Sequence, residues 1–125
     1  MTEVSQRRFR VANLAQRHKT FRPEAYFFVL QALESAMFDQ EVSQHISGQE
    51  LLEWIRNLGH ERYGVMAGDV FNAWGVHSTL DFGRIVFHLV ADGLLRKQNQ
   101  DSLRDFIDKF DFNDAFALKF FESQG

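Results

Sequence analysis

Apolar residues recur at intervals of three and four along most of this 125-residue chain, and this spacing places them on one face of an α-helix. It predicts a first, weakly amphipathic helix over residues 4–18. A second helix is predicted from Pro23, a residue that is well accepted in the first turn of a helix. Its apolar residues, which include Phe38, leave a narrow polar stripe, so we expect this helix at the centre of the fold. The stripe consists of Glu24, Gln31, Glu34 and Ser35.

The sharpest local signal is Ser-Gly-Gln-Glu at residues 47–50. The Ser47 hydroxyl can accept a hydrogen bond from the backbone N–H of Glu50, while the Glu50 carboxylate can accept one from the N–H of Ser47. This reciprocal arrangement, the capping box, predicts the start of a helix. We expect the helix to end at Gly64, because glycine readily adopts the left-handed conformation that closes many helices.

Two further helices are predicted before residue 94. The first runs from about residue 66 to residue 74 and ends at Gly75. The second is capped by Ser78 or Thr79, and its apolar face leads to Gly93.

The residues that follow Gly93 can be interpreted in two ways. Residues 94–97 and 105–110 flank a polar stretch, which favours a short β-hairpin. The competing interpretation is a helix, whose apolar face would consist of Leu103, Phe106, Ile107 and Phe110. We adopt the hairpin.

Three helices followed by a hairpin is the order of elements in a winged-helix domain. We therefore predict a mainly α fold (α+β) with a winged-helix-like three-helix core over residues 47–110, preceded by two N-terminal helices. A chain of this length is the size of one domain, to which we assign residues 1–125. Within it, residues 1–22 form a basic N-terminal helix or arm, and residues 111–125 form a Phe-rich tail.

The residues that catalysis or metal binding would need are missing or explained otherwise. The chain has no cysteine, which removes thiolate nucleophiles and thiolate zinc ligands. None of the five histidines is four residues from another, so a helical metal-binding pair is absent. The serines flank helices and the glycines are dispersed, so neither a nucleophile with its base nor a phosphate-binding loop is indicated. We expect no catalytic residue, no metal and no cofactor, and an enzyme ranks last among the function classes.

The sequence gives no sign of a membrane segment. No apolar run approaches the roughly 20 residues that cross a bilayer. The first ten residues lack the apolar segment that a secretory signal needs. We therefore expect a cytoplasmic protein without a membrane partner.

Charge is distributed unevenly along the chain. Residues 1–22 carry six basic side chains against one acidic side chain, which gives +5 there and −8 in the remainder, for a total of −3. Such an arm suits nucleic acid or an acidic partner. The chain's own acidic body is always at high local concentration, however, which favours packing within the chain. Contacts with nucleic acid, if made, are predicted at Arg7, Arg8, Arg10, Arg84, Arg96 and Lys97.

A winged-helix domain would place the helix after Ser78 in the major groove of DNA. Its exposed residues are expected to be Asp81, Arg84, His88 and Asp92. Two carboxylates against one guanidinium oppose binding to the phosphate backbone. Nucleic-acid binding is therefore the second function class.

Phenylalanine is the dominant aromatic residue, with 14 copies against two Trp and two Tyr. That composition fits a dense core, or a core with a docking face. In the tail, Phe112, Phe116 and Phe120 recur every four residues and Phe121 lies beside them, so the tail has an apolar face that needs a partner surface. We predict a protein–protein interaction module, with a protein partner or as a homodimer, that binds through Phe116, Phe120 and Phe121. By residue type, further anchor candidates are Trp54, Tyr63 and Trp74.

Four runs of the sequence carry a resemblance to a known family. They are FRPEAYFFVLQALE, HISGQELLEWIRNLGHERYG, AWGVHSTLDFGRIVFHLVADGLLRK and DSLRDFIDKFDFNDAF. The chain resembles, from Phe9 to Phe116, a family of small uncharacterised proteins found in Planctomycetes and Verrucomicrobia. The resemblance implies a single cytoplasmic bacterial domain and transfers no catalytic, binding or metal-ligating residue.

Overall fold

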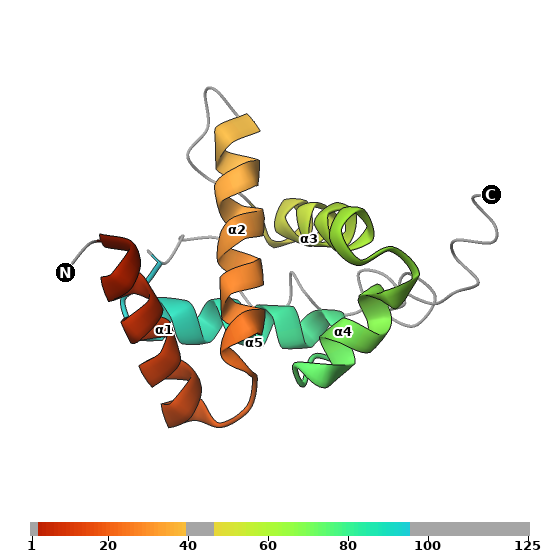
Figure 1. Ribbon diagram of the computed structural model, residues 1–125. Helices are drawn as coiled ribbons and strands as arrows, with labels where there is room; N and C mark the ends of the chain where they lie inside the picture. The colour runs from red at the N-terminus through yellow and green to blue at the C-terminus, as the bar shows by residue number, and fades with distance from the viewer. Residues whose placement is uncertain (1–2, 40–46, 96–125) are drawn as a thin grey trace.

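The computed structural model describes residues 3–39 and 47–95, and these residues are mainly helical (Figure 1). The helices are α1 (Glu3–His18), α2 (Pro23–Asp39), α3 (Gly48–Tyr63), α4 (Ala67–Ala73) and α5 (Thr79–Ala91), with a 3-10 turn, η1 (Gly64–Met66), before α4. The predicted mainly α fold is confirmed, and no strand occurs in the described residues.

α2 is the central helix of the structure. Figure 1 shows α1 on one side of it, α3 on the other, and α5 crossing behind its first turns, while α4 packs next to α3. The buried residues of α2 lie mainly on one broad face: Ala25, Tyr26, Phe28, Val29, Leu30, Ala32 and Ala36. The prediction that this helix lies at the centre is therefore correct.

One aromatic cluster ties four helices together. Between ring centroids, Phe28 of α2 lies 5.1 Å from Phe71 of α4, and Phe71 lies 5.5 Å from Phe82 of α5. Tyr63 at the end of α3 and Trp74 after α4 lie 6.2 Å and 5.6 Å from Phe71. Edge-to-face pairs of this kind add to the stabilisation that burial alone gives. Tyr63 and Trp74 therefore pack against the interior and are partly buried.

The predicted helix starts are formed as expected. The backbone N–H of Glu50 donates to Oγ of Ser47 at 3.1 Å, and the N–H of Ser47 donates to the Glu50 carboxylate at 3.4 Å, so the capping box is complete. Of the two caps proposed for α5, Ser78 is the one used, because its Oγ accepts from the N–H of Asp81.

The described part of the predicted hairpin is not a strand. The N–H groups of Leu94 and Leu95 both donate to the carbonyl oxygen of Leu89, at 2.8 and 3.2 Å. Gly93 adopts a positive φ of 79° and turns the chain back, so these two residues close α5. Residues 96–110, where both the rest of the hairpin and its helical alternative were predicted, lie outside the described residues.

The prediction that Asp81, His88 and Asp92 are exposed beside Arg84 is wrong. Asp81 is buried. Its carboxylate accepts hydrogen bonds from the N–H of His77 at 2.8 Å and from Nη1 of Arg84 at 2.7 Å. His88 and Asp92 contact α1, which covers the second half of α5. Polar residues on α5 are thus used to hold the chain together, and Arg84 alone of the four is exposed.

Candidate interaction surface

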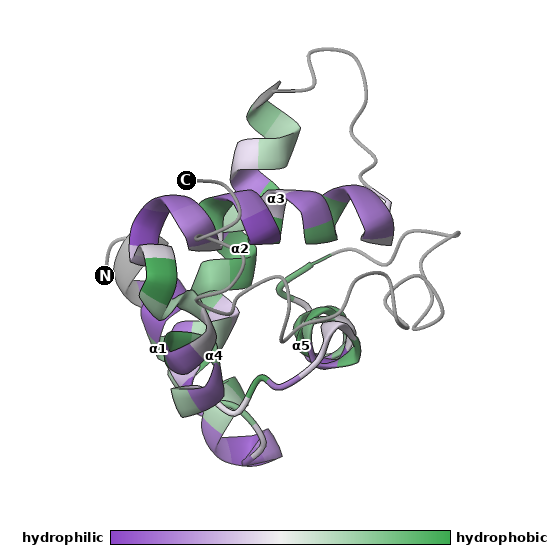
Figure 2. Cartoon of the chain, turned by 90° about the vertical axis from the view of Figure 1, so that its right-hand side faces the viewer, coloured by the Kyte–Doolittle hydropathy of each residue, from purple (hydrophilic) through white to green (hydrophobic). Residues whose placement is uncertain are grey.

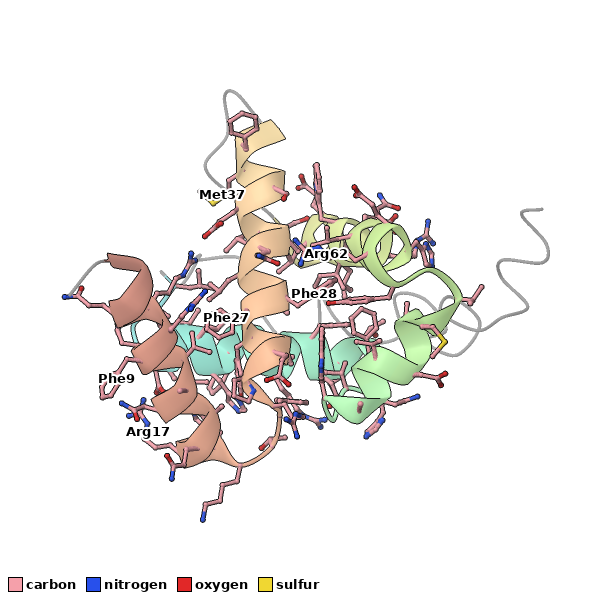
Figure 3. The ribbon with its side chains drawn as sticks, viewed as in Figure 1. Phe9, Arg17, Phe27, Phe28, Met37 and Arg62 are labelled. Carbon is pink, nitrogen blue, oxygen red and sulfur yellow. The ribbon has the colours of Figure 1, made fainter. Side chains whose placement is uncertain are left out.

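The end of α2 extends beyond the helices around it. Figure 1 shows its last turns standing clear of α1, α3 and α5, and in Figure 2 this end is coloured mostly as hydrophobic. Phe38 is 91% exposed there and Met37 is 41% exposed. Figure 3 shows the Met37 side chain projecting from the same end. A helix end that stands in solvent with a phenylalanine on it leaves apolar area uncovered.

A shallow groove of about 450 Å³ adjoins Phe38. It is formed between α2 and α3 by Glu34, Ser35 and Phe38 on one side and the half-buried Trp54 on the other. We call these four residues together with Met37 the α2–α3 surface. It combines an exposed aromatic ring with a tryptophan already fixed by the core, which is the composition of a binding anchor.

Two ion pairs lie in and next to the α2–α3 surface. Glu34 forms an ion pair with Arg7 of α1. On α3, Glu53 and Arg56 are 3.4 Å apart. Because both pairs are solvent-exposed, each contributes little to stability. The surface therefore has an apolar centre and a rim of mixed charge.

A second candidate is a polar cluster where α1, α2 and α5 meet. The imidazoles of His18 and His88 are stacked, with ring centroids 3.8 Å apart and planes 3° from parallel. Nδ1 of His88 lies 2.8 Å from the hydroxyl of Tyr26. The Asp92 carboxylate accepts a hydrogen bond from Nη2 of Arg17 at 2.5 Å and lies 3.6 Å from Nε2 of His18. We call these five residues the histidine cluster.

Burial changes the acid–base properties of two of these residues. It raises the pKa of Tyr26 to about 12, with a smaller contribution from the Asp92 carboxylate. It lowers the pKa of His88 below the usual 6.5, and His18 lowers it further, while Asp92 acts in the opposite direction. At neutral pH, Tyr26 therefore keeps its proton and His88 is uncharged.

The histidine cluster does not have the layout of a metal site. Within the described residues, no group of three His, Asp or Glu side chains is arranged to hold a metal ion. A polar groove of about 500 Å³ next to the cluster is lined by Arg10, Asn13, Gln16, Arg17, Asp92 and Leu94. Its arginines already hold the end of α5, since Arg10 donates to the Asp92 carbonyl oxygen at 3.2 Å and Arg17 pairs with the Asp92 carboxylate.

The structure places some of the residues predicted to contact nucleic acid and leaves others undescribed. Arg7 and Arg10 bind groups of the chain's own α2 and α5, in line with the expectation that the arm packs on its own body. Arg84 binds Asp81 of its own helix, and Arg8 is exposed. Arg96 and Lys97 lie outside the described residues, as do the predicted interaction residues Phe116, Phe120 and Phe121.

Reasoning from the sequence missed the exposure of Phe38. The predicted apolar face of the second helix includes Phe38, but this residue lies four residues after Glu34 and therefore falls in the polar stripe. That position was the signal that could have identified it. Phe9 and Phe87, each 62% exposed, were missed as well.

Comparisons with protein-family models, with curated protein sequences and with solved structures found no match to this chain. Among the helices in residues 3–39 and 47–95, none combines the length and the hydrophobicity that crossing a membrane requires.

Proposed function

We propose that the protein is a protein–protein interaction module and that its partner binds the α2–α3 surface. The observation that carries the proposal is Phe38, which is 91% exposed on a helix end that stands clear of the rest of the structure. Covering a phenylalanine side chain stabilises a complex by about 2 kcal/mol. The partly buried Trp54 beside it gives the partner a rigid second contact.

The shape of this surface favours a protein over a small molecule. Small-molecule sites are concave and cover most of the ligand. Here the groove is shallow and lies on a projecting helix, so a small ligand would stay largely in water. A protein, or a second copy of this chain, can cover both sides of the helix end.

The test uses Phe38→Ser, with Phe9→Ser as the matched control. Phe9 is also exposed, but it lies on α1 and points away from the other helices (Figure 3). Neither side chain is in the core, so both variants are expected to keep the helical circular dichroism of the wild type. Tagged protein is purified from its own host and its mass in solution is measured by light scattering.

We expect the wild type and Phe9→Ser to form the same complex or oligomer, and Phe38→Ser to form it at least tenfold more weakly. Tenfold corresponds to about 1.4 kcal/mol, less than the burial of one phenylalanine. Undiminished binding by Phe38→Ser would contradict the proposal. So would a wild type that is monomeric and captures no protein.

The winged-helix architecture is a second, finer proposal. The order α3, α4, α5 supports it, and after α5 the chain continues past Leu95 into the residues of the predicted hairpin. Such a domain would make nucleic-acid binding the alternative function. We rank that function lower because Arg7, Arg10 and Arg84 are occupied by groups of the same chain. We assign the chain no reaction.

A further inference from the structure

The histidine cluster joins the N-terminal helix to the rest of the structure. His18 is the last residue of α1, and its ring lies flat against His88 of α5. His88 in turn contacts Tyr26 of α2. Two imidazoles, side chains that can each take up a proton, therefore lie between α1 and the helices α2 and α5.

The groups that face this pair come from each helix packed against it. Arg17 and His18 lie on α1, Tyr26 on α2, and Asp92 at the end of α5. Asp92 is the one carboxylate among them, and Arg17 already uses it. Arg10 contacts the Asp92 backbone carbonyl and adds a second positive charge nearby.

The first proton can be accommodated in this arrangement. Placed on His18, it gives an ion pair with Asp92, whose carboxylate lies 3.6 Å from Nε2. The stack with an uncharged His88 is then kept. Tyr26 can donate its hydroxyl proton to the free Nδ1 of His88.

The second proton cannot be accommodated in the same way. It would place two cationic rings face to face at 3.8 Å, beside Arg17 and with one carboxylate to share. Protonation would also convert Nδ1 of His88 from an acceptor to a donor, so Tyr26 would have to turn its own proton away. Burial opposes this proton too, and accordingly the pKa of His88 is lowered.

We propose that the stacked His18–His88 pair is a pH-sensitive latch that holds α1 on α2 and α5 near neutral pH and releases it when both imidazoles are protonated. Among the described residues, α1 packs chiefly on α2 and α5, the two helices that the pair joins to it. Its buried residues Val11 and Leu14 would leave an apolar surface behind. α3 packs chiefly on α2, also contacts α4 and α5, and contributes no residue to the histidine cluster.

The test is hydrogen exchange of the full chain at pH 7.5 and pH 5.0, corrected for the intrinsic pH dependence of amide exchange. We expect protection in α1 to fall at least tenfold at pH 5.0 and protection in α3 to change less than twofold. His88→Gln and His18→Phe each remove one of the two imidazoles that can be protonated. In either variant, protection of α1 at pH 5.0 is expected to stay within threefold of its value at pH 7.5. His77→Gln, outside the cluster, is the matched control and should lose α1 protection as the wild type does.

Two results would overturn the latch. One is an equal loss of protection in α1 and α3, which is global unfolding. The other is an undiminished pH effect in both His88→Gln and His18→Phe. If one of these variants already exposes the α1 amides to exchange at pH 7.5, the other variant serves as the test of the latch. It also prevents both rings from being charged, but by a different substitution.

Discussion

Gly75 lies against the backbone of Thr20. A Cβ on Gly75 would stand 2.9 Å from the Thr20 carbonyl oxygen, and Gly75 has a φ of 91°. Next to it, the N–H of Arg22 donates to the carbonyl oxygen of Trp74 at 3.1 Å. The segment between α1 and α2 is thereby fixed to the segment between α4 and α5. Only glycine fits at position 75, because any side chain there would collide with the Thr20 carbonyl oxygen.

Gly75→Ala is therefore expected to destabilise the fold by more than the roughly 1 to 2 kcal/mol that a left-handed conformation alone costs a non-glycine residue. Gly64→Ala is the matched control, since Gly64 also has a positive φ but a Cβ there would meet open space. Urea unfolding followed by circular dichroism gives both free energies of unfolding. Equal losses in the two variants would show that the contact with Thr20 does not matter.

Tyr26 gives the stability of the fold a dependence on alkaline pH. Its pKa is raised from 10 in the unfolded chain to about 12 in the folded protein, chiefly by burial. Between these two pH values the folded state holds more protons than the unfolded state. The contribution of Tyr26 to the free energy of unfolding is therefore complete below pH 10 and is lost as the pH rises towards 12. Unfolding in urea at pH 8, 10 and 11 should show this fall.

In Tyr26→Phe the fall should become smaller, because the titrating hydroxyl is gone. Tyr63→Phe, which removes the other tyrosine hydroxyl, is the control and should keep the dependence of the wild type. A fall of the same size in Tyr26→Phe would mean that other groups cause it.

Local signals account for what the sequence could predict about the fold. The capping box at Ser47 and Glu50 and the glycines at 75 and 93 act within a few residues, so helix boundaries could be assigned without knowing the packing. The end of α1 carries no such glycine, and Lys19 takes the positive φ there instead. The spacing of the apolar residues alone located that end.

The parts that could not be predicted depend on residues far apart in the chain. Periodicity sorts polar from apolar positions but does not tell which polar positions a distant helix will cover. His88 pairs with Tyr26, 62 positions away, and Asp92 with Arg17, 75 positions away. Phe38 was misassigned for a related reason, because its exposure depends on how far the end of α2 projects beyond the helices around it.

We expect no specific binding to DNA. Arg84 is held by Asp81, and Arg7 and Arg10 are held by α2 and α5, so neutralising phosphates would require breaking these contacts first. A mixed-sequence duplex at micromolar protein should show no binding at roughly 0.15 M salt, and any binding at low salt should vanish as salt rises. Specific binding at the higher salt that is lost in Arg84→Ala would make nucleic-acid binding the favoured function.

The Phe-rich tail is expected to be divided between the chain's own surface and an interface. Phe87 on α5 is 62% exposed, so the described residues carry apolar area that another segment of the same chain can cover. Phe116→Ala should then behave as a core truncation, lowering the free energy of unfolding by about 3 to 5 kcal/mol while the mass in solution stays the same. A lower mass with unchanged helical circular dichroism would instead assign Phe116 to contact with a second chain.

Phe120 and Phe121 are expected to lie at the interface, because they are the outermost phenylalanines of the tail. Replacing both with serine should weaken self-association or partner capture while the thermal midpoint changes little, since side chains that contact a partner contribute little to the fold of the free chain. Light scattering and thermal unfolding monitored on the same samples measure the two effects. The opposite result would be a double variant that is largely unfolded, while its folded fraction associates as strongly as the wild type. That result would place both residues in the interior and leave the α2–α3 surface as the binding site.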